Sequence, residues 1–210
     1  MSDPRYTPLR ERHEALGASF TDFGGWQMPV RYTSDLAEHH AVRQAAGIFD
    51  ISHMAEFLVT GDFAGEFLDY SLAGRLSAMP VGKAKYSLML ADDGGIIDDV
   101  IVYRLADDRF LVIANAGNRG FVDSAFASRV RSFPSRIERE RAPLAAGEDR
   151  TFEGFLGDRG VDVEDVSDEY ALLAVQGPAS EAIVSSTAGI TDLSTPVSYT
   201  HLTLPTKRIV

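Results

Sequence analysis

Asp98 and Asp99 are the residues whose type and setting point most directly to chemistry. They lie within residues 94–103, where β-branched side chains after a glycine pair predict a β-strand. Alternate side chains of a strand point to opposite faces, so Asp99 shares its face with Ile101 and Asp98 shares the other with Val100. A buried carboxylate needs a partner or changes its pKa. Hydrogen bonding to the turn can explain one of them. The other indicates a carboxylate that points into a pocket and serves a ligand or a reaction.

Two polar side chains near Asp99 are candidates for the same pocket. Three successive segments are expected to form an antiparallel meander, at residues 84–90, 96–105 and 109–114. Tyr86 lies on the first of these strands and Asn115 directly follows the third, so both could converge with Asp99. Asn115 offers a donor and an acceptor, which suits the edge of a heterocycle. The alternatives are that Asn115 caps the sheet edge and that Tyr86 is a core ring.

Other familiar signatures are absent from the sequence. There is no glycine-rich nucleotide motif, no GxSxG, no CxxC and no EF-hand pattern. His39 and His40 are adjacent on a predicted helix, where they point about 100° apart and cannot easily share a metal. We expect them to be surface residues or residues that support a site from behind its lining. Ser52 and His53 could belong to a hydrolase triad, but we favour a serine that bonds the backbone at the start of a strand.

Composition limits the class of protein. The 210 residues suffice for one large or two small domains, with 45% hydrophobic and 24% charged residues. The formal net charge of −11 argues against nucleic-acid and anionic-membrane surfaces. Without cysteine, disulfides and thiolate chemistry are excluded. No signal peptide and no membrane-spanning run is evident, so we predict a cytoplasmic protein.

The remaining elements predict an α+β fold in which helices flank antiparallel sheets. A first helix is expected from Thr7-Pro8, and a second, capped by Ser34 or Asp35, is expected to end near Gly47. Residues 22–30 are too rich in Gly and Pro for a regular element, and we read them as a loop that packs its apolar side chains or lines a pocket. Further elements are expected at 56–60 (strand), 62–71 (helix), 119–130 (helix), 168–175 (strand) and 178–186 (helix), with a flexible crossing over 134–168.

An ordered series of motifs resembles a known family. The motifs are Asp22-Phe23-Gly24-Gly25-Trp26-Gln27-Met28-Pro29, His40-Ala41-Val42-Arg43, Gly47-Ile48-Phe49-Asp50-Ile51-Ser52-His53-Met54, Gly82-Lys83-Ala84-Lys85-Tyr86-Ser87, Gly94-Gly95-Ile96-Ile97-Asp98-Asp99 and Gln176-Gly177-Pro178. Together they resemble the aminomethyltransferase, or T-protein, of the glycine cleavage system, from residue 5 to about 196.

The resemblance implies both a reaction and a site. Such enzymes take the aminomethyl group carried on the lipoyl arm of the H-protein. They transfer its methylene carbon to tetrahydrofolate, the co-substrate, and release ammonia. The implied fold is the folate-binding N-terminal part of a three-domain cloverleaf, truncated here. Asp99 matches the catalytic aspartate, beside the reactive pterin nitrogens. The implied folate-lining residues are Met54, Leu58, Tyr86, Asp99, Ile101 and Asn115.

The resemblance also sets expectations for domains and for rival functions. Residues 1–196 are expected to form the folate-binding region, with 54–133 as a subdomain of meander and helix, and 197–210 as a non-native tail without acidic residues. Since family members are much longer, we expect the 210-residue chain alone to bind folate weakly and to be inactive. The rivals are a folate-binding protein of iron–sulfur cluster maintenance and a folate-dependent demethylase module. The motifs 22–29 and 52–54 favour the transferase over the first, and the start at Met1 argues against the flavin-fused second.

Overall fold

The computed structural model describes residues 3–141 and 160–187, and the side chains of 134–141 are not part of that description. These residues form two compact units. One comprises residues 3–54 and 168–187 and is called the N-terminal unit below. The other comprises residues 55–141 and 160–167 and is called the sheet unit. The expected non-native tail, 197–210, lies outside the described residues.

The sheet unit is built on a five-stranded antiparallel sheet of order β5-β6-β7-β4-β8. Its strands are β4 (Ala55–Thr60), β5 (Ala84–Leu90), β6 (Ile96–Ala106), β7 (Arg109–Ala114) and β8 (Asp162–Asp165). Its helices are α3 (Ala64–Ser71), the short 3-10 helix η1 (Ala116–Asn118) and α4 (Arg119–Arg141). The predicted meander is therefore confirmed as β5, β6 and β7, in register Tyr86↔Ile101 and Ile101↔Ile113.

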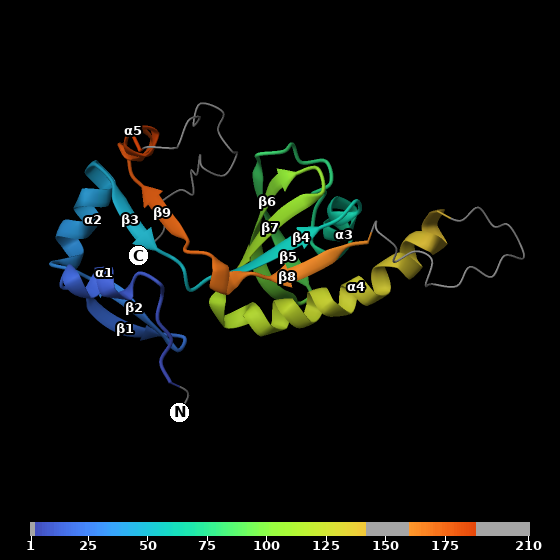
Figure 1. The fold of residues 1–210 in the computed structure, drawn as a ribbon, viewed down its shortest axis with the longest axis horizontal. Helices are drawn as coiled ribbons and strands as arrows, with labels where there is room; N and C mark the ends of the chain where they lie inside the picture. The colour runs from blue at the N-terminus through green and yellow to red at the C-terminus, as the bar shows by residue number, and fades with distance from the viewer. Residues whose placement is uncertain (1–2, 142–159, 188–210) are drawn as a thin grey trace, which may run out of the picture. The chain divides into compact units, whose positions relative to one another are not determined.

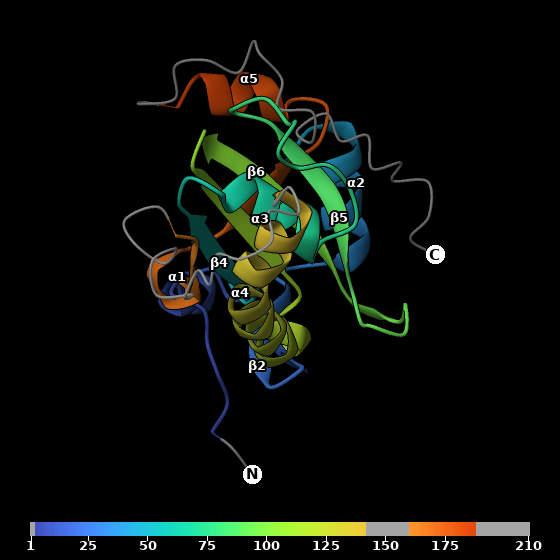
Figure 2. The same ribbon diagram turned by 90° about the vertical axis from the view of Figure 1, so that its right-hand side faces the viewer.

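Helices α3 and α4 pack on one face of this sheet (Figure 1, Figure 2). Phe67 of α3 and Phe126 of α4 meet with ring centroids 5.9 Å apart, and Phe126 contacts Phe57 of β4 at 5.7 Å. Val100 and Val102 of β6 point into the same core and are fully buried. The helices thus fix which face of the sheet is the core and leave the opposite face for other contacts.

The N-terminal unit holds two two-stranded antiparallel sheets and three helices. They are β1 (Ser19–Phe23) paired with β2 (Trp26–Arg31), β3 (Gly47–Asp50) paired with β9 (Leu173–Gln176), and α1 (Arg10–Ala15), α2 (Asp35–Gln44) and α5 (Ser180–Ser185). Ser34 caps α2 by accepting the Ala37 N–H, which confirms this predicted cap. A 3-10 turn, η3 (Ser167–Glu169), follows β8 in the sequence.

Several sequence expectations were wrong in this part of the chain. Residues 22–30 are not an irregular loop, because Phe23 pairs with Trp26 and the glycines between them take φ values of +62° and +87°. Such a pair makes the two-residue turn of a hairpin. The first helix begins at Arg10 and not at Thr7-Pro8, since the Thr7 hydroxyl donates to Asp50 instead of capping the helix. Strand β3 was not expected at all.

The flexible crossing predicted for 134–168 was also wrong at both ends. Helix α4 continues to Arg141, and β8 joins β4 as the edge strand of the sheet, with Phe57 opposite Asp165. The charged composition of this region suggested a linker. However, a helix with a polar outer face and a short edge strand have the same composition. The strand expected at 168–175 is shorter and begins only at Leu173.

Candidate functional site: the open face of the five-stranded sheet

The face of the sheet opposite the core, called the open face below, carries most of the predicted site. Strand β6 alternates, with Asp98 buried at 3% exposure and Asp99 exposed. Asp98 belongs to the side of Val100 and Val102, and Asp99 to the side of Ile101. The structure thus confirms that the two carboxylates lie on opposite faces of the strand.

Strand pairing brings the predicted apolar contacts together on the open face. Tyr86 of β5 lies opposite Ile101 of β6, which in turn lies opposite Ile113 of β7. In the next row of the same face, Tyr103 of β6 and Leu58 of β4 both lie opposite Leu111 of β7. Tyr86 remains 43% exposed, so the prediction that it is a core ring is excluded. The face therefore offers aromatic and aliphatic side chains to a flat ligand.

Asn115 follows β7 directly, and it connects the two aspartates. Its backbone N–H donates to Asp98 Oδ2 (2.8 Å), and its side-chain amide donates to Asp98 Oδ1 (2.9 Å) and to Asp99 Oδ1 (2.9 Å). Asn118 adds a third donor to Asp98, at 2.7 Å. Asp98 is thus the buried anchor of the turn after β7, while Asp99 keeps an exposed carboxylate that Asn115 orients.

Tyr103 is a second tyrosine of the open face. Burial raises the pKa of the Tyr103 hydroxyl, and the neighbouring Tyr86 adds to this effect. Tyr103 therefore stays protonated at neutral pH and is available only as a hydrogen-bond partner. The exposed carboxylate of Asp99 offers this face a group that can exchange a proton with a ligand.

Met54 is the one predicted site residue that falls in the other unit. It is half-buried, and its N–H donates to the Ile51 carbonyl (3.1 Å). Leu58, Tyr86, Asp99, Ile101 and Asn115 all lie in the sheet unit. The structure thus groups these five, and the role of Met54 stays a prediction.

Glu56 is a feature of the open face that the sequence reading missed. It lies on β4 opposite Ile113 and, two residues before Leu58, points to the same face as Leu58. Yet only 1% of its surface is exposed. Its backbone N–H donates to Ser167 Oγ at 2.9 Å. Strand alternation, which points Ala55, Phe57 and Val59 into the core, could have predicted that Glu56 points to the open face. It could not have predicted that Glu56 is buried there.

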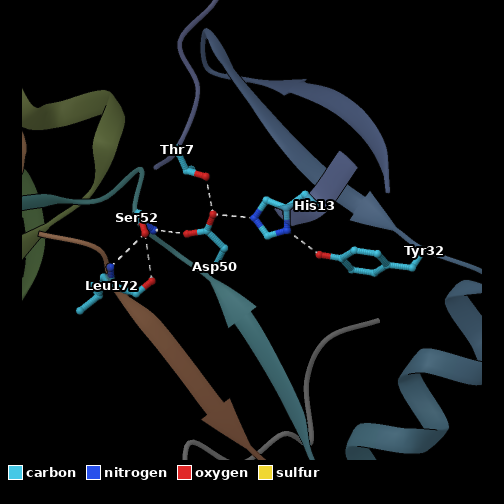
Figure 3. Close-up of polar contacts among 6 residues, drawn as sticks. All are labelled: Thr7, His13, Tyr32, Asp50, Ser52 and Leu172. Carbon is cyan, nitrogen blue, oxygen red and sulfur yellow. Dashed lines mark hydrogen bonds and ion pairs between the residues drawn. The ribbon is translucent and has the colours of Figure 1, made fainter. Parts of the chain in front are cut away.

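A second polar cluster, in the N-terminal unit, was also missed (Figure 3). Asp50 Oδ2 accepts from the Thr7 hydroxyl (2.5 Å) and from His13 Nε2 (2.8 Å), and Asp50 Oδ1 accepts the Ser52 N–H (3.0 Å). His13 Nδ1 lies 2.7 Å from the Tyr32 hydroxyl, which donates to it when the imidazole is neutral and Nε2 carries the proton. The cluster connects the segment before α1, helix α1, the residue that follows β2 and the end of β3.

The charge state of Asp50 follows from these contacts. Burial alone would raise the pKa of its carboxyl, but hydrogen bonds from Ser52, Thr7 and His13 outweigh burial and hold that pKa below its ordinary value. Asp50 is therefore ionised at neutral pH. Burial of the Tyr32 hydroxyl, together with the negative charge of Asp50, raises the pKa of Tyr32.

Ser52 and His53 do not form a hydrolase pair. The Ser52 hydroxyl accepts the Leu172 N–H (2.9 Å) and donates to the Leu172 carbonyl (3.3 Å), which confirms the favoured backbone role. His53 packs edge-on against Phe23 at 5.4 Å, and burial lowers its pKa. His39 and His40 are both exposed, as expected. Among residues 3–141 and 160–187, no group of three acidic or histidine side chains could hold a metal ion.

Comparison with known families gives the assignment. The family model described as the GCVT N-terminal domain matches residues 9–204, which is most of the chain. The chain belongs to this family. Within the described residues, no helix has the length and apolar character needed to cross a membrane.

Relatives of the GCVT-family chain carry a common name. It is 46% identical over 199 residues to a protein of Saccharopolyspora erythraea named aminomethyltransferase, and 48% identical over 184 residues to one of Cutibacterium acnes with the same name. These alignments cover 95% and 88% of the chain, but 47% and 43% of the relatives. The chain thus spans about half the length of the curated relatives it matches.

A solved structure agrees with the sequence relatives. The crystal structure of glycine cleavage system aminomethyltransferase T from Bartonella henselae superposes with a TM-score of 0.69 at 36% identity. The match covers 86% of this chain and 43% of that one. The antiparallel α+β fold that the sequence predicts is therefore confirmed as the fold of this family.

Proposed function

We propose that the chain binds tetrahydrofolate on the open face of its five-stranded sheet and takes part in aminomethyl transfer. In the proposed reaction, the methylene carbon passes from the aminomethyl-lipoyl arm of the H-protein to tetrahydrofolate, and ammonia leaves. Membership of the GCVT family and the shared name of the relatives support this function. The product would be 5,10-methylenetetrahydrofolate, with dihydrolipoyl H-protein released.

The placement of Asp99 carries the proposal. Its carboxylate is exposed on a face otherwise lined by Tyr86, Ile101 and Leu58, and Asn115 holds it at 2.9 Å. A carboxylate in such a setting can accept a proton from a reacting nitrogen and stabilise positive charge at the methylene carbon. Asp98 cannot do so, because it is buried on the core side and engaged by three N–H donors.

The remaining residues are assigned to binding. Tyr86 offers a ring edge or face for stacking on the pterin, and Leu58 and Ile101 provide apolar contact. Asn115 would bind the heterocycle edge through its side-chain carbonyl, since its amide N–H groups already donate to the aspartates. Met54, which directly precedes β4, is proposed as a further contact with the ligand.

Titration of the isotopically labelled chain with tetrahydrofolate, followed by NMR, tests this proposal. We expect binding weaker than micromolar, with shift changes concentrated at Leu58, Tyr86, Asp99 and Ile101. Val100, which neighbours the same strand positions from the core side, serves as the internal control. Shift changes that concentrate on the helix-covered face, or no response at millimolar tetrahydrofolate, would contradict the proposed site.

A further inference from the structure

One edge strand of the five-stranded sheet, β5, and the segment that precedes it carry an unusual charge. Residues 70–91 contain three basic residues, Arg75, Lys83 and Lys85, and no acidic residue, in a chain whose net charge is −11. We call these three residues the basic edge. Strand β5 is the terminal strand of the sheet order, so this segment lies at the periphery of the sheet unit.

The structure gathers Arg75 and Lys85 on neighbouring segments. The chain around Ala73 runs beside β5, because its N–H donates to the Leu88 carbonyl (2.8 Å) and its carbonyl accepts from the Ser87 hydroxyl (2.6 Å). The ammonium group of Lys85 lies next to Gly74, at 3.6 Å from the position a Cβ would take there. Arg75 is the next residue. Both basic residues are exposed, and neither forms an ion pair within the described parts of the chain.

The loop that carries Arg75 is held in place by the carboxylate of Asp69. Asp69 accepts the backbone N–H groups of Leu76 and of Ser77 (2.9 Å) and the hydroxyl of Ser77 (2.5 Å). Its carboxylate thus serves the backbone of the loop. A fixed loop loses little conformational freedom when a partner binds to it.

From this arrangement we infer that the basic edge is the docking surface for an acidic carrier protein. This inference rests on the proposed function, in which a carrier delivers its group on a flexible lipoyl arm. Lys85 has the parity of the core-side residues Ser87 and Met89, and the next residue, Tyr86, points to the open face. Because β5 is a terminal strand, a carrier docked at this edge is separated from the ligand face only by that strand, and a flexible arm can reach around it. The surrounding chain repels an acidic protein, so a local basic surface determines where such a partner binds.

Charge reversal with a matched control tests this inference. The variant Arg75→Glu/Lys85→Glu changes the net charge by −4. So does Arg12→Glu/Arg43→Glu, which alters exposed residues of the N-terminal unit. Binding of fluorescently labelled lipoylated H-protein to the chain is measured by anisotropy, at about 50 mM and about 500 mM salt. We expect the basic-edge variant to bind at least about tenfold more weakly at low salt, with the difference largely lost at high salt. The control variant should keep most of the affinity.

Two further measurements keep the test decisive. The neutral variant Arg75→Gln/Lys85→Gln should lose an intermediate amount of affinity, and thermal unfolding should show that all variants remain folded. Equal losses in the basic-edge and control variants would overturn the inference, as would a wild-type chain that binds H-protein no better than the basic-edge variant. Tetrahydrofolate titration distinguishes the two proposals. If the wild-type chain does not bind tetrahydrofolate, the proposed function is contradicted. If it binds tetrahydrofolate but the basic-edge variant binds H-protein as tightly as the wild type, only the docking surface is contradicted.

Discussion

Replacing Asp98 by asparagine should destabilise the sheet unit far more than the same change at Asp99. Three N–H donors converge on the Asp98 carboxylate, from the Asn115 backbone and from the side chains of Asn115 and Asn118, at 2.7–2.9 Å. Hydrogen bonds to a charged group contribute about 1.5–3 kcal/mol each. An asparagine at position 98 retains one acceptor oxygen, so the bond from the Asn115 backbone N–H is lost. The NH₂ group of the new side chain then faces that N–H, which is also a donor.

We therefore expect Asp98→Asn to lower the free energy of unfolding by about 2–4 kcal/mol, more than a simple turn bond of about 1 kcal/mol would give. Urea unfolding of the chain at pH 7 measures this loss, as a fall in the midpoint on the order of 1–2 M for a domain of this size. Asp99→Asn is the matched control. Its carboxylate is exposed and accepts one side-chain bond, so the loss should stay below about 1 kcal/mol. Equal losses in both variants, or the reverse order, would refute the assignment of Asp98 as the anchor.

Two further predictions concern stability. The pKa of the Asp50 carboxyl is lower in the folded chain than in the unfolded one. The ionised carboxylate therefore adds to the free energy of unfolding above the unfolded pKa of about 3.9, and this addition is lost as the pH falls through the folded-state pKa. The stability difference between wild type and Asp50→Asn should thus be constant from pH 7 to pH 5 and shrink below about pH 4; a gap that grows on acidification would contradict the ionised state. Gly177→Ala should cost at least about 3 kcal/mol, since φ is +125° and a Cβ would lie 2.5 Å from the Ala45 carbonyl, whereas Gly120→Ala in α4 meets nothing within 4 Å and should be neutral or stabilising by up to about 1 kcal/mol. Thermal unfolding of both glycine variants checks this prediction. Comparable melting temperatures would contradict the close packing of Gly177 against the Ala45 carbonyl.

Local patterns were sufficient to predict the meander and the opposite directions of Asp98 and Asp99. Both follow from the two-residue period of a strand, which is written directly in the sequence. The hairpin of β1 and β2 was missed because Gly24-Gly25 was read as a sign of irregular structure, although a glycine pair is also what a tight turn requires. Composition likewise could not separate a polar helix and an edge strand from a linker in 134–168.

The parts of the site that could not be predicted depend on long-range contacts. Thr7 and His13 meet Asp50 across 43 and 37 residues, and no local spacing encodes that approach. The approach of Asn115 to Asp99, in contrast, was predicted from the expected meander, and the structure shows it as a hydrogen bond of 2.9 Å. The two bonds from Asn115 to the buried carboxylate of Asp98 were not predicted.

The most direct test of the central claim is turnover by a chimera. The matched 199-residue region of the Saccharopolyspora erythraea aminomethyltransferase is replaced by the corresponding region of this chain, and formation of methylenetetrahydrofolate from aminomethylated H-protein is assayed. We predict that Asp99→Asn lowers turnover by about 10²-fold or more, while tetrahydrofolate affinity changes by no more than about threefold. Folded Asp98→Asn chimera should keep most of its turnover. Near-normal turnover by the Asp99 variant would contradict the account, and so would a larger catalytic loss in the Asp98 variant.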